Sequence, residues 1–166
     1  MTDWEYTFIA EHRVARLGTV GAHGQPAVVP IVYAFDGIAL FTPLDAKPKR
    51  VATAQLQRVR NIRANPRVAI IIDTYSEDWQ QLAWVHVHGQ ARVTTTGDAY
   101  TTGMSLLCGK YPQYERMPLA GCPLIVIEPT SIHSWRASDA ALPRNVSARG
   151  KSGTVSVIGS EQDTTP

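Results

Sequence analysis

The chain has 166 residues, of which 44% are hydrophobic and 18% are charged, and these values predict one globular domain with a sizeable core. A formal net charge of +2 argues against nucleic acid as a partner, and no apolar run is long enough to cross a membrane. The first residues lack the order of a signal peptide and the two cysteines form no metal-binding pattern, so we expect a cytoplasmic protein with free thiols.

The N-terminal third predicts one helix and three strands. Asp3 is a plausible N-cap for a helix that ends near Glu11. The strands are RVARLGTVG, AVVPIVYAF and IALFTPL, and tight turns between them, including Asp36-Gly37, predict an antiparallel meander. Pro30 lacks a backbone donor, which predicts an edge, a bulge or a place where another group approaches.

Residues 47–73 carry seven of the sixteen Lys and Arg residues and no acid until Asp73. The helical spacing of Val51, Leu56, Val59 and Ile62 predicts an amphipathic helix from Lys47 that loosens before Arg63. After Pro66 the run RVAIIIDTY predicts a central strand, because both of its faces are apolar.

The C-terminal part predicts two more strands around one helix. AWVHVHGQARVTT alternates strictly, with a bulge expected at Gly89, and a helix is expected from Gly97-Asp98 to just before Pro112. PLIVIEPTSIHSW predicts a sixth strand, interrupted at Pro129. We therefore predict an α+β fold over 1–136, a small six-stranded antiparallel barrel with flanking helices, and a flexible tail over 137–166.

The basic segment predicts an anion site. Several cations near a helix start can bind a phosphate or carboxylate, although a solvated basic face would show the same pattern. The cations concerned are Lys47, Lys49, Arg50 and Arg58.

Other polar residues suggest weaker hypotheses. His86 and His88 share one strand face, where they could line a subunit interface, a substrate pocket or, without an obvious third ligand, a metal. The segment 111–114 could rim a substrate pocket or simply end a helix. Motifs for a catalytic serine, a P-loop or a zinc protease are missing from the sequence, which favours chemistry carried by a cofactor.

Four segments together resemble one known family. They are RLGTVGAHGQPAVVPIVYAFDG, DAKPKRVATAQLQRVRNIRANPRVAIIID, WVHVHGQARV and PLIVIEPTSIHSW. This combination is similar to the pyridoxamine 5′-phosphate oxidase-like split β-barrels, which bind flavin or deazaflavin, and in particular to the branch predicted to use coenzyme F420. The resemblance implies a homodimer with the cofactor between subunits.

The resemblance also implies roles for particular residues. Lys47, Lys49, Arg50 and Arg58 would hold the cofactor phosphate, and Asn61 would bond either the cofactor or backbone. At the end of its strand Thr42 could bond ring or phosphate oxygens, and Pro30 would offer backbone at the other ring edge. Trp135 would face the partner's cofactor, or else close the barrel end.

The implied function is an F420-dependent oxidoreductase that passes hydride between the cofactor and a small conjugated substrate. Two alternatives stay open: an FMN-dependent enzyme like pyridoxamine 5′-phosphate oxidase, and a non-catalytic protein that binds a flavin or tetrapyrrole. Fold resemblance alone does not separate these functions.

Overall fold

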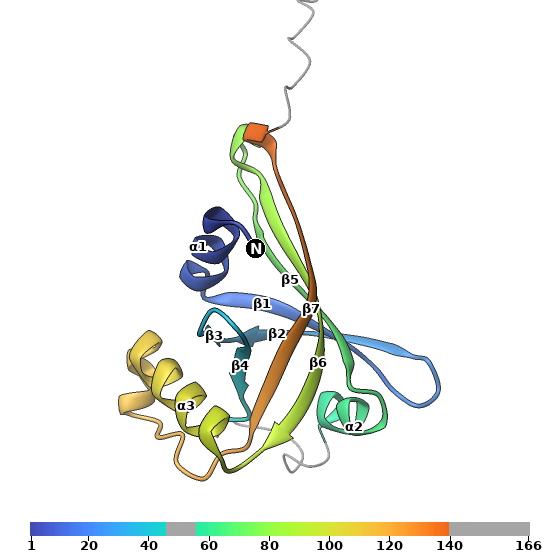
Figure 1. Cartoon of the computed structure of the whole chain (residues 1–166), viewed down its shortest axis with the longest axis vertical. Helices are drawn as coiled ribbons and strands as arrows, with labels where there is room; N and C mark the ends of the chain where they lie inside the picture. Colours follow the sequence, from blue (N-terminus) through green and yellow to red (C-terminus); the bar gives the residue numbers. More distant parts are fainter. Residues whose placement is uncertain (46–55, 140–166) are drawn as a thin grey trace, which may run out of the picture.

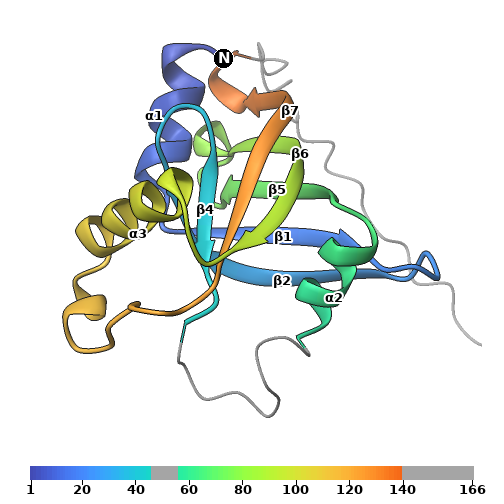
Figure 2. The same ribbon diagram turned by 60° about the horizontal axis from the view of Figure 1, so that its bottom comes forward.

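The computed structural model describes residues 1–45 and 56–139, which form a single curled antiparallel sheet with helices against it (Figures 1 and 2). The sheet order is β2-β1-β5-β6-β7-β4-β3. The elements are α1 (Asp3–Glu11), β1 (Val14–Val20), β2 (Pro26–Val32), β3 (Ala34–Phe35), β4 (Leu40–Pro43), α2 (Gln57–Ala64), β5 (Arg67–Thr74), β6 (Ala83–Thr94), α3 (Asp98–Lys110) and β7 (Leu124–Arg136), with 3-10 turns at Trp79–Gln81, Pro112–Glu115 and Ala137–Asp139. The predicted α+β class and antiparallel sheet are confirmed.

The described residues form seven strands rather than six, because the predicted strand 27–35 is divided at Tyr33. β1 and β2 pair as predicted, from Val14 opposite Val32 to Val20 opposite Pro26. β4 pairs with β3 through the predicted hairpin, but the predicted continuous meander is wrong, because β3 and β4 lie at the opposite edge of the sheet from β1 and β2, and β4 also pairs with β7. The Tyr33 N–H donates to the Tyr111 hydroxyl (3.1 Å) instead of to a neighbouring strand, so the chain leaves the sheet there.

Turn and bulge chemistry agrees with the sequence in most places. Gly37 has φ 95°, and the Asp36 carboxylate accepts hydrogen bonds from the backbone N–H groups of the next turn residues, which confirms the hairpin. Pro30 lies on the edge strand β2, as predicted. The register shifts at Gly89, which lies opposite Pro129. β7 is therefore continuous and the predicted interruption is wrong, because the bulge accommodates the proline.

Two helix boundaries differ from the predictions. The N-cap of α1 is Thr2 rather than Asp3, because Thr2 and Glu5 form a reciprocal capping box. The first part of the helix predicted from Lys47 lies outside the described residues. Leu56 has non-helical backbone (φ −59°, ψ 134°), and α2 begins at Gln57. It then runs through Arg63, which is exposed, because Val59 and Ile62 set the buried face of this shorter helix.

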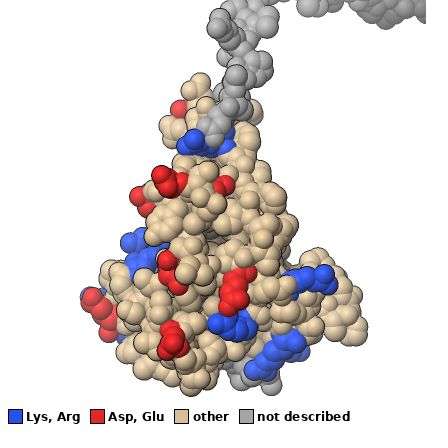
Figure 3. All heavy atoms as spheres, viewed as in Figure 1, with Lys and Arg blue, Asp and Glu red and all other residues tan. Residues whose placement is uncertain are grey.

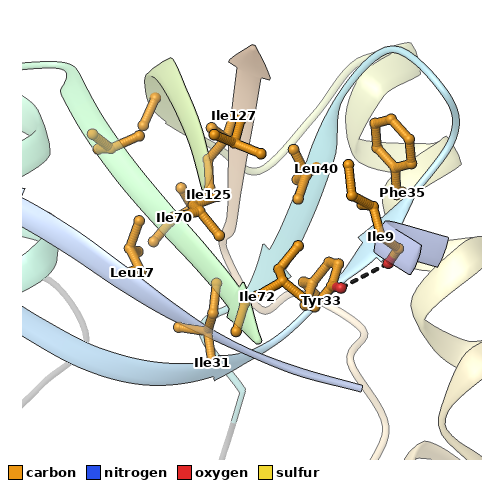
Figure 4. Packing of buried hydrophobic residues seen from close by; sticks show 14 of the residues in the cluster. Ile9, Leu17, Ile31, Tyr33, Phe35, Leu40, Ile70, Ile72, Ile125 and Ile127 are labelled. Atoms are coloured by element: carbon orange, nitrogen blue, oxygen red, sulfur yellow. Dashed lines mark hydrogen bonds between the residues drawn. The ribbon is translucent and has the colours of Figure 1, made fainter. Parts of the chain in front are cut away.

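The core consists of two clusters on opposite sides of the sheet. Alternate residues of the central strands fill the inside of the curl, where Ile9 from α1 joins them (Figure 4). A second cluster lies between α3 and strands β4 and β7, and contains Phe41, Leu107, Tyr111 and Leu124. Cys108 and Cys122 are free thiols, as predicted.

Gly103 sets how closely α3 approaches the sheet. A Cβ at this position would lie 2.6 Å from the Phe41 ring and 2.7 Å from Leu124. Gly103→Ala should therefore lower the free energy of unfolding by about 1–3 kcal/mol through overpacking, despite the better helix propensity of alanine. Urea denaturation followed by circular dichroism measures this change.

Gly109 provides the matched control, because it lies on the same helix and an added Cβ would meet nothing within 4 Å. Gly109→Ala should be neutral or stabilising, by up to about 1 kcal/mol. Equal effects of the two substitutions would contradict close packing at Gly103.

Candidate functional site

A cleft of about 260 Å³ lies between the edge strand β2, the end of β4 and the start of α2. It brings together three residues that were predicted separately from the sequence, Pro30, Thr42 and Arg58. The remaining walls are Ile31, Val32, Pro43, Asp45 and Leu56. Because β2 and β4 lie near opposite edges of the sheet, the cleft exists only where the curled sheet brings these edges together (Figure 2).

Arg58 and Asp45 form the charged part of the cleft. Burial lowers the pKa of Arg58, while nearby Asp45 acts in the opposite direction. Asp45 is buried and accepts a hydrogen bond from the Tyr114 hydroxyl (3.1 Å). Burial, and after it the Asp45 charge, raises the pKa of Tyr114, so this phenol stays a donor. The described part of the cleft therefore carries one cation beside one acid.

The donor set fits a planar ring with polar edges and an anionic tail. Thr42 is 3% exposed and lies at the end of β4, while Arg58 is half-buried. An edge strand such as β2 also presents unpaired backbone groups. Acidic and basic side chains are interspersed on the face in Figure 3, so this face is not uniformly basic. Lys47, Lys49 and Arg50 lie outside the described residues and stay predictions.

Asn61 is not among the walls of this cleft. Its side chain is 1% exposed, donates to the Thr19 hydroxyl (3.0 Å) and accepts from the Gln57 amide (2.7 Å). The bond to Thr19 connects α2 to β1 and the bond from Gln57 lies within α2, so the amide already has protein partners on both sides. Its predicted contact with a cofactor stays a prediction.

Trp135 lies on the outer face of the sheet, opposite Trp84, away from the cleft walls of its own chain. The neighbouring pair on this face is His86 and His133, with His88 next along β6. The His86 and His88 ring centroids are 4.4 Å apart, and those of His88 and His133 are 6.2 Å apart. Among the described residues, no group of three or more His, Cys, Asp or Glu could hold a metal ion.

Sequence reasoning missed Asp45 as a wall of the cleft, and it named Tyr114 only as part of the segment 111–114 that could rim a substrate pocket, not as a partner of Asp45. Asp45 directly follows the third predicted strand, and its position as the last acid before a long basic run is a signal that could have marked it. The contact with Tyr114, 69 residues away, had no local signal.

Comparison with known proteins identifies the class. Residues 2–136 match the family described as pyridoxamine 5′-phosphate oxidase. The chain is 30% identical over 138 residues to a 5a,11a-dehydrotetracycline/5a,11a-dehydrooxytetracycline reductase of Streptomyces rimosus, a match that covers 81% of this chain and 82% of the relative. The chain therefore belongs to the pyridoxamine 5′-phosphate oxidase family, and the predicted class, an oxidoreductase, is confirmed at that level.

Solved structures share the fold at low identity. The conserved hypothetical protein Rv2991 of Mycobacterium tuberculosis has a TM-score of 0.67 and 23% identity, covering 96% of this chain and 94% of that one. An F420 reductase has a TM-score of 0.55 and 23% identity, covering 76% of this chain and 94% of that one.

Within residues 1–45 and 56–139, every helix is too short or too polar to span a membrane.

The three outer-face histidines predict a loss of stability in acid. The pKa of His86 is lowered by burial and then by His88 and His133. Since the unfolded value is 6.5, the unfolded state binds the proton more readily, and stability falls as the pH drops through this value. His86→Gln should reduce the loss of Tm between about pH 8 and about pH 5.5.

His23→Gln is the control, because His23 lies in the exposed turn between β1 and β2, away from the other histidines. Its acid-induced loss of Tm should match that of the wild type. A His86→Gln profile equal to the wild type would contradict the electrostatic coupling on this face.

Proposed function

We propose that this protein is an F420-dependent oxidoreductase of the cytoplasm that transfers hydride between the deazaflavin and a small conjugated substrate. The observation that carries this proposal is the cleft in which Pro30, Thr42 and Arg58 meet. Two comparisons support it: the relative from Streptomyces rimosus is a reductase, and an F420 reductase shares the fold.

Each wall of the cleft has a distinct role in this proposal. Arg58 attracts the anionic tail, and its guanidinium offers several N–H donors to phosphate oxygens. The Thr42 hydroxyl donates to an oxygen at the ring edge. Ile31, Pro43 and Leu56 provide apolar surface against which the ring packs and which excludes water. The bound deazaflavin would supply a hydride donor that reacts poorly with oxygen, because carbon replaces a flavin nitrogen.

Further cations belong to the same proposal. Asp45 beside Arg58 offsets part of its charge, so binding a phosphate tail requires more positive charge than the described cleft holds. Lys47, Lys49 and Arg50 are close to the cleft in sequence and are the cations that we assign to this role.

We also propose a homodimer with the cofactor between subunits. The outer face of β5, β6 and β7 presents Ile71, Trp84, His86, His133 and Trp135 next to one another in register. Protein interfaces are enriched in aromatic side chains and depleted of charge at their centres. A second copy of the chain on this face would bring its own Trp135 toward the cofactor.

Cofactor titration tests the main proposal. Purified protein is titrated with F420 and with FMN, and cofactor fluorescence is followed. We expect selective F420 binding, and Arg58→Ala should raise its Kd about ten- to hundredfold, because a hydrogen bond to a charged group is lost.

Arg63→Ala is the matched control, because Arg63 lies on the same helix but is exposed and outside the cleft walls. Its Kd should stay within about twofold of the wild type. A preference for FMN would indicate that the cofactor of this protein is a flavin and not a deazaflavin. Failure to bind either cofactor would sink the oxidoreductase proposal and favour a non-catalytic binder.

Sedimentation velocity tests the homodimer. Trp135→Glu places a charge on the outer face, where desolvating it would be costly, and should shift the protein toward monomer. Ile38→Glu is the control, since Ile38 is exposed in the turn between β3 and β4. A wild-type monomer at micromolar concentration would contradict the proposed dimer.

A further inference from the structure

A second cavity, of about 280 Å³, lies at the end of α3, between the start of β1, the end of β2 and the 3-10 turn that follows α3. Its polar walls are Arg13 and Gln113, and its apolar walls include Val32, Tyr111, Tyr114 and Met117. The volume lies just below the range of about 300–1,000 Å³ that is typical of pockets for drug-sized ligands. The cavity is therefore large enough for a small molecule with one or two fused rings.

A wall of side chains separates this cavity from the proposed cofactor cleft. Val32 lines both spaces, and the Tyr114 hydroxyl donates to Asp45 on the cleft side (3.1 Å). A molecule in the cavity therefore lies apart from a ring held in the cleft. The cavity suits a ligand that takes no part in hydride transfer.

Arg13 gives the cavity a positive charge. One guanidinium N–H donates to the Lys110 carbonyl (2.9 Å), and the guanidinium carbon lies 5.6 Å from the centre of the Tyr111 ring. These contacts hold the side chain beside the cavity and leave its other N–H groups available. Among the described residues, no carboxylate forms an ion pair with Arg13.

Lys110 adds positive charge behind Arg13. Its ammonium donates to the carbonyls of Ala10 and His12 (2.7 and 2.6 Å) at the C-terminal end of α1. A cation at such an end stabilises a helix, which accounts for the position of Lys110. Burial and the charge of Arg13 lower the pKa of Lys110 to about 8, as expected where two cations lie close together without an acid to offset them.

The other walls provide aromatic surface and one further donor. Both phenol hydroxyls are already bonded, that of Tyr111 to backbone carbonyls and that of Tyr114 to Asp45. The exposed Gln113 side chain has no hydrogen bond to any described residue, so its amide is available to a ligand. An apolar space with a guanidinium and an amide at its edge fits a flat apolar body that ends in an anionic group.

We propose that this cavity binds an aromatic monocarboxylate, with its ring against Tyr111 and Met117 and its carboxylate on Arg13. Guanidinium and carboxylate groups are planar and match in a two-point contact, and Gln113 adds a further N–H. A single available cation favours a carboxylate with one negative charge over a phosphate monoester, which carries about −1.5 to −2. This site is separate from the cofactor cleft, and its assignment does not depend on the proposed function.

The first test compares a charged ligand with an uncharged one. The full chain, without added cofactor, is titrated in a calorimeter with 2-naphthoate and with 2-naphthamide, which has nearly the same shape. We expect saturable binding of 2-naphthoate and a Kd for 2-naphthamide that is at least about tenfold higher, because the bond to a charged group is lost. Absence of saturable 2-naphthoate binding up to about 1 mM, or equal Kd values for the two probes, would overturn the proposal.

The second test removes the charge of Arg13. Arg13→Gln keeps an N–H donor for the Lys110 carbonyl, and should raise the Kd for 2-naphthoate at least about tenfold, close to that for 2-naphthamide. Arg16→Gln is the matched control, because Arg16 lies outside the cavity and pairs with Asp73 (2.6 Å), so the wild-type Kd is expected. Wild-type affinity in Arg13→Gln, with folding verified by circular dichroism, would contradict the proposed contact.

The third test fills the cavity. Met117→Trp should abolish 2-naphthoate binding, whereas Ile38→Trp should leave it unchanged, because Ile38 is exposed and outside both spaces. Val14→Trp, at another wall of the cavity, serves if Met117→Trp does not fold. Retained affinity in the folded variant would show that the ligand binds elsewhere.

Arg58→Ala distinguishes the cavity from the cleft. Arg58 is the cation in the described part of the cleft, so a carboxylate bound there would lose affinity in this variant. We expect a Kd for 2-naphthoate within about twofold of the wild type. A loss of about tenfold or more would place the ligand in the cleft and overturn the assignment. Since these titrations need no cofactor, failure to bind F420 leaves this proposal intact, and failure to bind 2-naphthoate leaves the proposed function intact.

Discussion

The fold depends on a pair of buried tyrosines where the chain crosses from one sheet edge to the other. The Tyr33 hydroxyl donates to the Ile9 carbonyl (2.7 Å, Figure 4), and the Tyr33 N–H donates to the Tyr111 hydroxyl. That hydroxyl lies 2.7 Å from the Arg13 carbonyl and 2.8 Å from the Tyr33 carbonyl. Burial raises the pKa of both phenols, so they stay protonated donors. These hydrogen bonds give partners to backbone N–H and C=O groups that the break between β2 and β3 would otherwise leave unpaired in the core.

This crossing also creates the candidate cofactor cleft and the cavity next to it. Because the chain leaves the sheet directly after β2, that strand keeps an open edge, and β4 forms at the far side of the curl. The cleft lies between these two strands, and the second cavity lies where Tyr111 packs behind Val32. The residues that stabilise the crossing therefore position the walls of the proposed cofactor cleft.

The two spaces differ in their charge. In the cleft, Arg58 lies near Asp45, so its field is partly offset and a phosphate needs cations from the adjoining basic segment. In the cavity at the end of α3, Arg13 lies among aromatic and aliphatic walls, and no described carboxylate forms an ion pair with it.

By itself the sequence determined the features that depend on near neighbours. These include the strand β6 with its bulge at Gly89, the hairpin turn at Asp36-Gly37 and helix α3. It also indicated the family, and it marked Pro30, Thr42 and Arg58 before the structure brought them into one cleft. Periodicity and turn chemistry act over a few residues, so such features can be read directly from the chain.

Only the tertiary structure decided which distant parts meet. The pairing of β4 with β7, the bond of Asn61 to Thr19 and the contact of Tyr114 with Asp45 all depend on how the sheet curls and how its helices pack on it. Tyr33 and Tyr111 are 78 residues apart, and no local pattern connects them. Packing of the whole core selects such contacts, because each one is stable only when the surrounding side chains exclude water.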